Sequence, residues 1–85
     1  MSPQDADALN RFVGEVASEL AALGLQRAAK RLVAIQGTAY TTGSEWLGEL
    51  GTAVRDIRGQ YPIPPALDTR LERIMTEVRR AWPAL

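Results

Sequence analysis

The stretch LNRFVGEVASELAALG, residues 9–24, decides the fold. Its large apolar side chains recur at steps of one, three and four residues, at Leu9, Phe12, Val13, Val16, Leu20 and Leu23. A helix places residues with this spacing on one stripe of its surface. Gly24 follows the last of them, where helices commonly end in a left-handed residue. The stretch therefore predicts an amphipathic helix, and Ser2 and Pro3 are residue types that favour its start.

Three further segments show the same helical spacing, and no segment alternates in the manner of a strand. Ser44 is the predicted N-cap of the third helix, and three prolines stiffen the link before the fourth. Short links usually make neighbouring helices antiparallel. We expect an all-α protein, a compact antiparallel four-helix bundle that forms a single domain over residues 1–85. The predicted helices cover about residues 3–23, 25–39, 44–59 and 65–82.

The composition excludes several classes of protein. The chain has no Cys and no His, which excludes a disulfide scaffold, a zinc finger and thiol chemistry. Ten basic residues balance ten acidic ones, and 46% of the residues are apolar, which argues against a disordered chain. No motif arranges the remaining reactive side chains into a catalytic or phosphate-binding pattern. We therefore expect no enzymatic activity and no cofactor.

Weaker features of the sequence indicate the cellular compartment of the protein and the kind of genome that encodes it. The first seven residues carry two acids and no basic cluster, unlike a secretory signal, and no uncharged run is long enough to span a bilayer. We expect a cytoplasmic protein without membrane contact. Lys30 is the only Lys beside nine Arg, a bias that is typical of a GC-rich bacterial genome.

The aromatic residues suggest where a partner binds. Trp46 precedes the apolar stripe of the third helix and Trp82 ends the fourth, so both are expected at the edge of the bundle. Tryptophans in such positions are frequent hot spots of protein–protein contacts. Together with Glu45 and Glu49, they form the predicted partner-binding surface. The favoured function is a protein–protein interaction module of the accessory, regulatory or antitoxin and immunity type. Self-association as a homodimer, in which one apolar stripe is left over for a second copy, is a further possibility.

Glycines inside the predicted helices allow two interpretations. Gly48 and Gly51 share a face of the third helix, and each costs about 1 kcal/mol relative to Ala in a helix interior. The favoured interpretation is a close approach to the small residues of the first helix, Gly14, Ala17 and Ala21. The other is a flat groove that is open to a partner helix.

Two other functions compete with protein binding. Arg27, Lys30 and Arg31 lie on one face of the second helix and could contact nucleic-acid phosphates, although pairing with the acids of the first helix is favoured by the zero net charge. Glutamates one helical turn apart could hold a divalent cation for a metal-dependent enzyme if their helices face each other. These glutamate pairs are Glu15 with Glu19 and Glu45 with Glu49.

Overall fold

The structure, a computed structural model, describes residues 4–85 and contains no strand in this range. Its four helices are α1 (Gln4–Ala22), α2 (Gln26–Gly37), α3 (Gly43–Gln60) and α4 (Pro65–Ala81). The predicted helices are confirmed with small shifts of their ends. The second ends earlier than expected because Thr38 adopts an extended backbone with φ −92° and ψ 136°. The predicted helix start at Ser2 and Pro3 lies outside the described residues.

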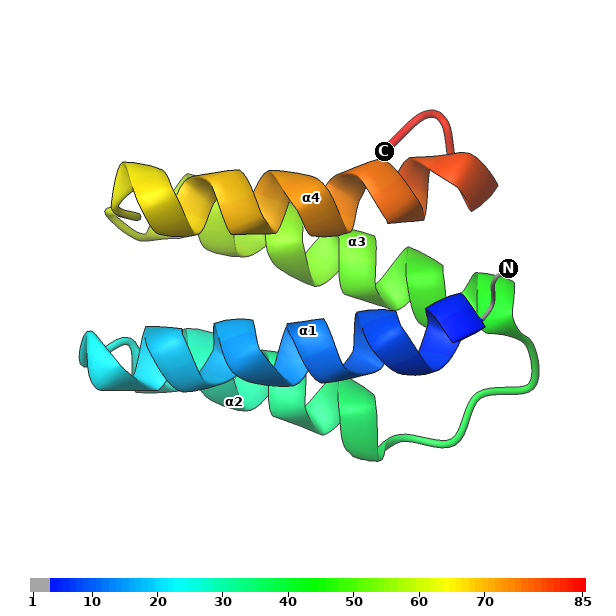
Figure 1. Ribbon diagram of the computed structural model, residues 1–85, viewed down its shortest axis with the longest axis horizontal. Coiled ribbons are helices and arrows are strands. Elements are labelled where there is room, and N and C mark those ends of the chain that lie inside the picture. The colour runs from blue at the N-terminus through cyan, green and yellow to red at the C-terminus, as the bar shows by residue number, and fades with distance from the viewer. Residues whose placement is uncertain (1–3) are drawn as a thin grey trace.

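The helices form a four-helix bundle in which each helix contacts two neighbours (Figure 1). Helix α1 packs against α2 and α4, and α3 packs against the same two helices. The α1–α2 and α3–α4 pairs make the most extensive contacts, whereas α1 and α3 lie diagonally across the bundle and their backbones do not approach closely. The start of α1, the start of α3 and the end of α4 lie at one end, beside the α2–α3 loop. The expected compact antiparallel bundle is confirmed.

The apolar stripes of all four helices meet in one core. Its largest fully buried side chains include one leucine from each helix, which are Leu20, Leu32, Leu50 and Leu71. Leu23 departs from the prediction, because 52% of its surface is exposed. Helix α1 ends at Ala22, and the chain turns at Gly24, whose φ of 85° is the left-handed conformation expected there. The turn takes Leu23 off the stripe.

Thr42, and not Ser44, caps the start of α3. The Thr42 hydroxyl accepts a hydrogen bond from the backbone N–H of Glu45 at 3.1 Å, and the Glu45 carboxylate accepts one from the backbone N–H of Thr42 at 3.1 Å. This reciprocal arrangement needs Thr or Ser three residues before Glu or Gln. Ser44 is followed at that distance by Leu47, so the prediction that Ser44 caps the helix is wrong.

The small face of α3 lies against α4 and the C-terminal segment. A Cβ atom added to Gly51 would lie 2.6 Å from Cγ1 of Val78, and one added to Gly48 would lie 3.2 Å from Nε1 of Trp82. The Trp82 indole also donates a hydrogen bond to the carbonyl oxygen of Ser44 at 2.7 Å. The prediction of close packing at these glycines is therefore right, but its expected partner, helix α1, is wrong, because α1 and α3 are diagonal.

Charge pairing also differs from the expectation that α2 pairs with the acids of α1. Arg31 of α2 binds Asp56 of α3 at 2.8 Å, and Glu19 of α1 binds Arg70 of α4. The sequence could not reveal these partners, because the order of the helices around the bundle decides which charged faces become neighbours.

The α3–α4 pair carries the densest ionic network. Arg58 binds Asp68 through two nitrogens, at 2.8 and 3.1 Å, and binds Glu72 at 2.7 Å. The second oxygen of Glu72 accepts a hydrogen bond from Arg79 at 2.7 Å. The hydrogen bonds from Arg58 and then Arg79 lower the pKa of Glu72.

This shift predicts a loss of stability in acid. A carboxyl group whose pKa is lower in the folded chain stabilises the fold when the pH is above its unfolded value, and that contribution disappears as the pH falls through the folded value. We expect the free energy of unfolding of the wild type to start falling near pH ~4.3, the ordinary value for Glu, and to continue falling below it. Urea denaturation between pH 7 and pH 3 measures this, and Glu72→Gln should show a smaller loss. An equal pH dependence of both proteins would contradict the assignment to Glu72.

Candidate functional site

A groove lies on the surface between α1 and α4 and reaches the start of α3. It consists of one hollow of about 540 Å³ and an adjoining one of about 330 Å³, which share Leu9, Glu77 and Arg80. Volumes of this order are typical of binding pockets. We call the two together the α1/α4 groove. Its large apolar residues are Leu9, Phe12, Trp46 and Leu47, and its charged residues are Arg11, Glu15, Arg73, Glu77 and Arg80.

The apolar side chains of the groove are the outer members of the core stripes. Leu9 and Phe12 continue the stripe of α1 toward its first turns, and Trp46 and Leu47 begin the stripe of α3. All four are half-buried and pack against the core. Helix α1 contacts α4 less extensively than it contacts α2, so these residues are not fully covered. The groove therefore presents apolar surface that is already held in place by the core.

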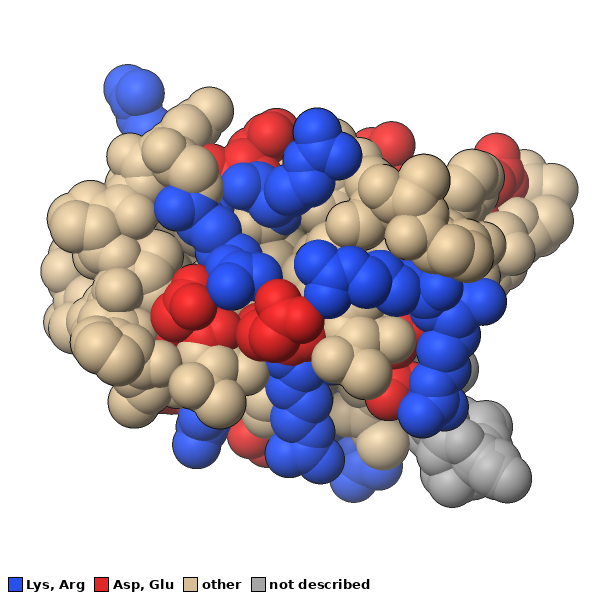
Figure 2. Space-filling view, turned by 90° about the horizontal axis from the view of Figure 1, so that it is seen from above, with Lys and Arg blue, Asp and Glu red and all other residues tan. Residues whose placement is uncertain are grey.

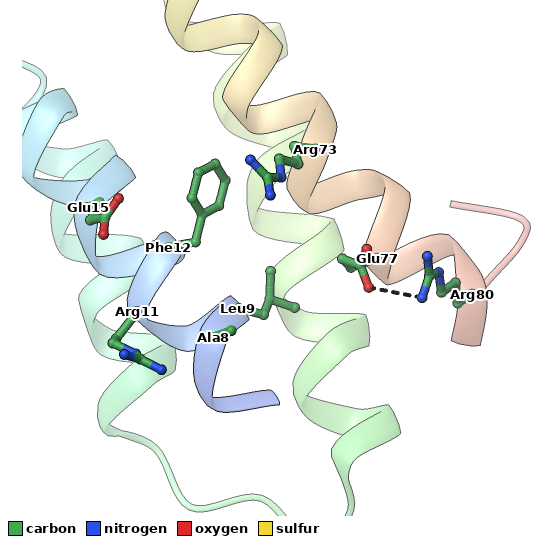
Figure 3. Close-up of a pocket in the computed structure, with 8 residues that line it drawn as sticks. All are labelled: Ala8, Leu9, Arg11, Phe12, Glu15, Arg73, Glu77 and Arg80. Carbon is green, nitrogen blue, oxygen red and sulfur yellow. Dashed lines mark ion pairs between the residues drawn. The ribbon is translucent and has the colours of Figure 1, made fainter. Parts of the chain in front are cut away.

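Phe12 and Arg73 point toward each other from opposite walls of the groove (Figure 3). The guanidinium carbon of Arg73 lies 5.1 Å from the centre of the Phe12 ring, and that of Arg70 lies 6.0 Å from it. Both distances suit a cation–π interaction. Arg70 also pairs with Glu19, whereas Arg73 has no carboxylate within 4.0 Å among residues 7–85. Arg73 is thus a positive charge that is held at the apolar surface and is available to a ligand.

The rest of the rim carries charges of both signs. Glu77 pairs with Arg80 at 3.5 Å, as the dashed line in Figure 3 shows. Arg11 and Glu15 lie one turn apart on α1 and make no ion pair within the part of the chain whose side chains are described. Figure 2 looks onto the α4 side of the bundle and shows basic side chains spread over it with acidic ones between them. Positive charges outnumber negative ones around the groove by one.

The predicted partner-binding residues divide between two hollows. Trp46 lines the α1/α4 groove, whereas Glu45, Glu49 and Trp82 line a hollow of about 500 Å³ together with Tyr40. We call the latter the Trp82 hollow. Trp46 is half-buried and 43% of Trp82 is exposed, so the expectation that both lie at the edge of the bundle is confirmed. Glu45 also serves in the cap of α3, and the Trp82 indole is bound to Ser44.

Sequence reasoning missed the α1 and α4 contributions to the groove. Leu9 and Phe12 were assigned to the buried stripe of the first helix, and their partial exposure has no signal in the sequence. Arg73 and Arg80 are separated from them by about 60 to 70 residues. Only the packing of α1 beside α4 brings these residues together.

One of the three basic residues on the exposed face of α2 is engaged in an ion pair. Arg31 binds Asp56 at 2.8 Å, while Arg27 and Lys30 are exposed and have no ion pair among residues 7–85. Nucleic-acid binding usually neutralises several phosphates. The hypothesis of phosphate contact through this face therefore depends on two unpaired cations, and it stays a prediction.

The two glutamate pairs do not face each other. Glu15 and Glu19 lie on α1, Glu45 and Glu49 lie on α3, and these helices are diagonal. Within the part of the chain that the structure describes, no three acidic side chains gather in an arrangement that could hold a metal ion. The geometry required by the metal-site hypothesis, carboxylates on facing helices, is absent among these residues.

Comparisons with protein-family models, with curated proteins and with solved structures return no match. Within residues 4–85, none of the helices combines the length and the apolar character that crossing a bilayer requires.

Proposed function

We propose that the protein is a non-catalytic binding module that captures a partner protein in the α1/α4 groove. The observation that carries this proposal is the set of four large apolar side chains, Leu9, Phe12, Trp46 and Leu47, that the core fixes in a half-buried state around two adjoining hollows. Aromatic side chains in preformed hollows are the usual anchors of protein–protein interfaces. This proposal keeps Trp46 of the predicted surface at the centre of the contact.

The chemistry of the lining supports binding over catalysis. The residues around the groove are apolar or are Arg and Glu, and none of them is a Ser, Thr, Tyr or Lys that could act as a nucleophile. The whole chain has neither Cys nor His. The groove thus offers surface and charge to a ligand, which suits an accessory or regulatory protein. The excess of Arg over Lys is typical of a GC-rich bacterial genome and supports a bacterial origin.

Affinity capture with matched variants tests this proposal. Phe12→Ala and Trp46→Ala remove apolar anchors of the groove, and Val33→Ala removes an apolar side chain of α2 that is 54% exposed and lies outside the groove. We expect the wild type and Val33→Ala to retain the same partner from an extract of the source organism, and both groove variants to lose most of it. Mass spectrometry identifies the retained proteins.

Circular dichroism provides the control for folding. Each groove variant should keep the helical signal of the wild type, because these side chains lie at the margin of the core. Retention of the same proteins by all four baits would contradict the proposed function. Loss of helical signal in Trp46→Ala would show that Trp46 belongs to the core, and Phe12→Ala would then decide the question.

A further inference from the structure

The shape of the α1/α4 groove restricts what can occupy it. Its two hollows adjoin at Leu9 of α1 and at Glu77 and Arg80 of α4, and the smaller one also reaches Trp46 and Leu47 at the start of α3, so together they form a trough along α1 and α4. A convex ridge of apolar side chains fits such a trough, and the apolar stripe of an amphipathic helix is a ridge of this kind.

A second copy of this chain does not offer such a ridge. The apolar stripes of the four helices are used in the core, apart from their outer residues, which line the groove itself. Among the described residues, the exposed large apolar side chains are Leu23 at the end of α1, Val33 on α2 and Trp82 beyond α4. These residues belong to three separate parts of the chain and form no helical stripe. The occupant must therefore bring its own apolar surface.

The charges of the groove indicate which charge its ligand carries. Glu77 is paired with Arg80 at 3.5 Å, and among residues 7–85 Arg11, Glu15 and Arg73 make no ion pair. Of these three, Arg73 is the residue whose charge lies over the apolar surface, at the Phe12 ring. The Phe12 ring holds the Arg73 guanidinium 5.1 Å from its centre, so a ligand that covers Phe12 also meets this cation. A carboxylate beside the apolar stripe of the ligand could form a charge-assisted hydrogen bond with it, while a cation would be repelled.

We propose that the α1/α4 groove binds an amphipathic helix of a partner protein in which acidic residues flank the apolar stripe. This inference rests on the proposed function and specifies the chemistry of the partner. The Leu or aromatic side chains of the partner helix contact Phe12 and Trp46, and its acidic residues contact Arg73.

Two designed peptides of about 18 residues test the inference. Both carry the same leucines at i, i+3, i+4 and i+7, and the flanking positions are Glu in one and Lys in the other. Titration calorimetry at ~50 mM and ~200 mM salt measures their dissociation constants. We expect the Glu peptide to bind at least ~10-fold more tightly than the Lys peptide at low salt, with a smaller difference at high salt.

Matched variants assign the effect to one residue. Arg73→Gln should weaken binding of the Glu peptide about 10-fold, the size expected for the loss of one charge-assisted contact. Arg27→Gln makes the same substitution at an exposed, unpaired Arg of α2 and should leave the affinity unchanged.

Any other outcome of the peptide titrations contradicts the inference. Whether the proposed function fails with it depends on the capture experiment. The proposal that the partner helix is acidic would be overturned by three results. These are equal binding of both peptides, tighter binding of the Lys peptide, and no binding of either peptide. The proposed function would survive these results if Phe12→Ala still abolished capture of a partner, and it would fail with the inference if capture were independent of the groove. A mass that doubles with concentration and requires Phe12 would identify a second copy as the occupant and also overturn the inference.

Discussion

Leu20→Ala should lower the free energy of unfolding by about 2–5 kcal/mol. Leu20 is the last fully buried residue on the stripe of α1, and truncation leaves a cavity among core residues of a bundle that holds only 85 residues. Domains of this size bury a smaller share of their surface than larger ones, and their total stability is often near the lower end of about 5–15 kcal/mol. Urea denaturation followed by circular dichroism measures the change.

Leu23→Ala is the matched control for this prediction. It makes the same substitution three residues later on the same apolar stripe of the sequence, at a side chain that is 52% exposed. We expect a change within about 0.5 kcal/mol. Similar losses at both positions would show that α1 continues beyond Ala22 and buries Leu23.

Gly51→Ala should destabilise the protein by about 1–3 kcal/mol, although Ala is the better helix former. Its Cβ atom would lie 2.6 Å from Cγ1 of Val78 and 2.9 Å from Cδ1 of Leu85. Leu85 can shift, but Val78 is fully buried on α4 and can move only if α3 and α4 separate. The close approach of α3 and α4 therefore explains why residue 51 is a glycine. Thermal and urea denaturation measure the loss.

Gly59→Ala tests the same substitution on the same helix where space is available. Apart from its chain neighbours and the backbone of its own helix, no described atom lies within 4 Å of a Cβ atom added there. We expect an unchanged or higher stability, by up to about 1 kcal/mol, because Ala lowers the conformational entropy of the unfolded chain. A stabilising effect at both positions would contradict the close α3–α4 contact.

The fold could be predicted from local features of the sequence. The recurrence of apolar residues places Leu20 and Leu32 on core stripes, and Gly24 occupies the left-handed turn that ends α1. These signals depend on residues within one or two turns of each other, so they do not require knowledge of the packing. The cap of α3 belongs to the same class, since Thr42 and Glu45 carry the capping-box pattern in the sequence itself, whereas Ser44 lacks a Glu or Gln three residues later.

The candidate site could be predicted only in part, because it depends on which helices are neighbours. Trp46 was identified from its place before an apolar stripe, and it does line the groove. Phe12 and Arg73 are far apart in the chain and meet only because α1 packs beside α4. The same reason explains the misassigned partner of Gly51: sequence spacing gives the small face of α3 but not the helix that covers it.

The two tryptophans provide the most direct test of the groove as the binding site. Each indole N–H gives its own signal in a nitrogen-15 correlation spectrum, and Trp82→Phe assigns the pair. On addition of the Glu peptide, we expect the Trp46 signal to shift, because Trp46 lines the groove, and the Trp82 signal to stay, because its N–H is bound to Ser44. A shift of Trp82 with Trp46 unchanged would place binding in the Trp82 hollow, and that result would contradict the account.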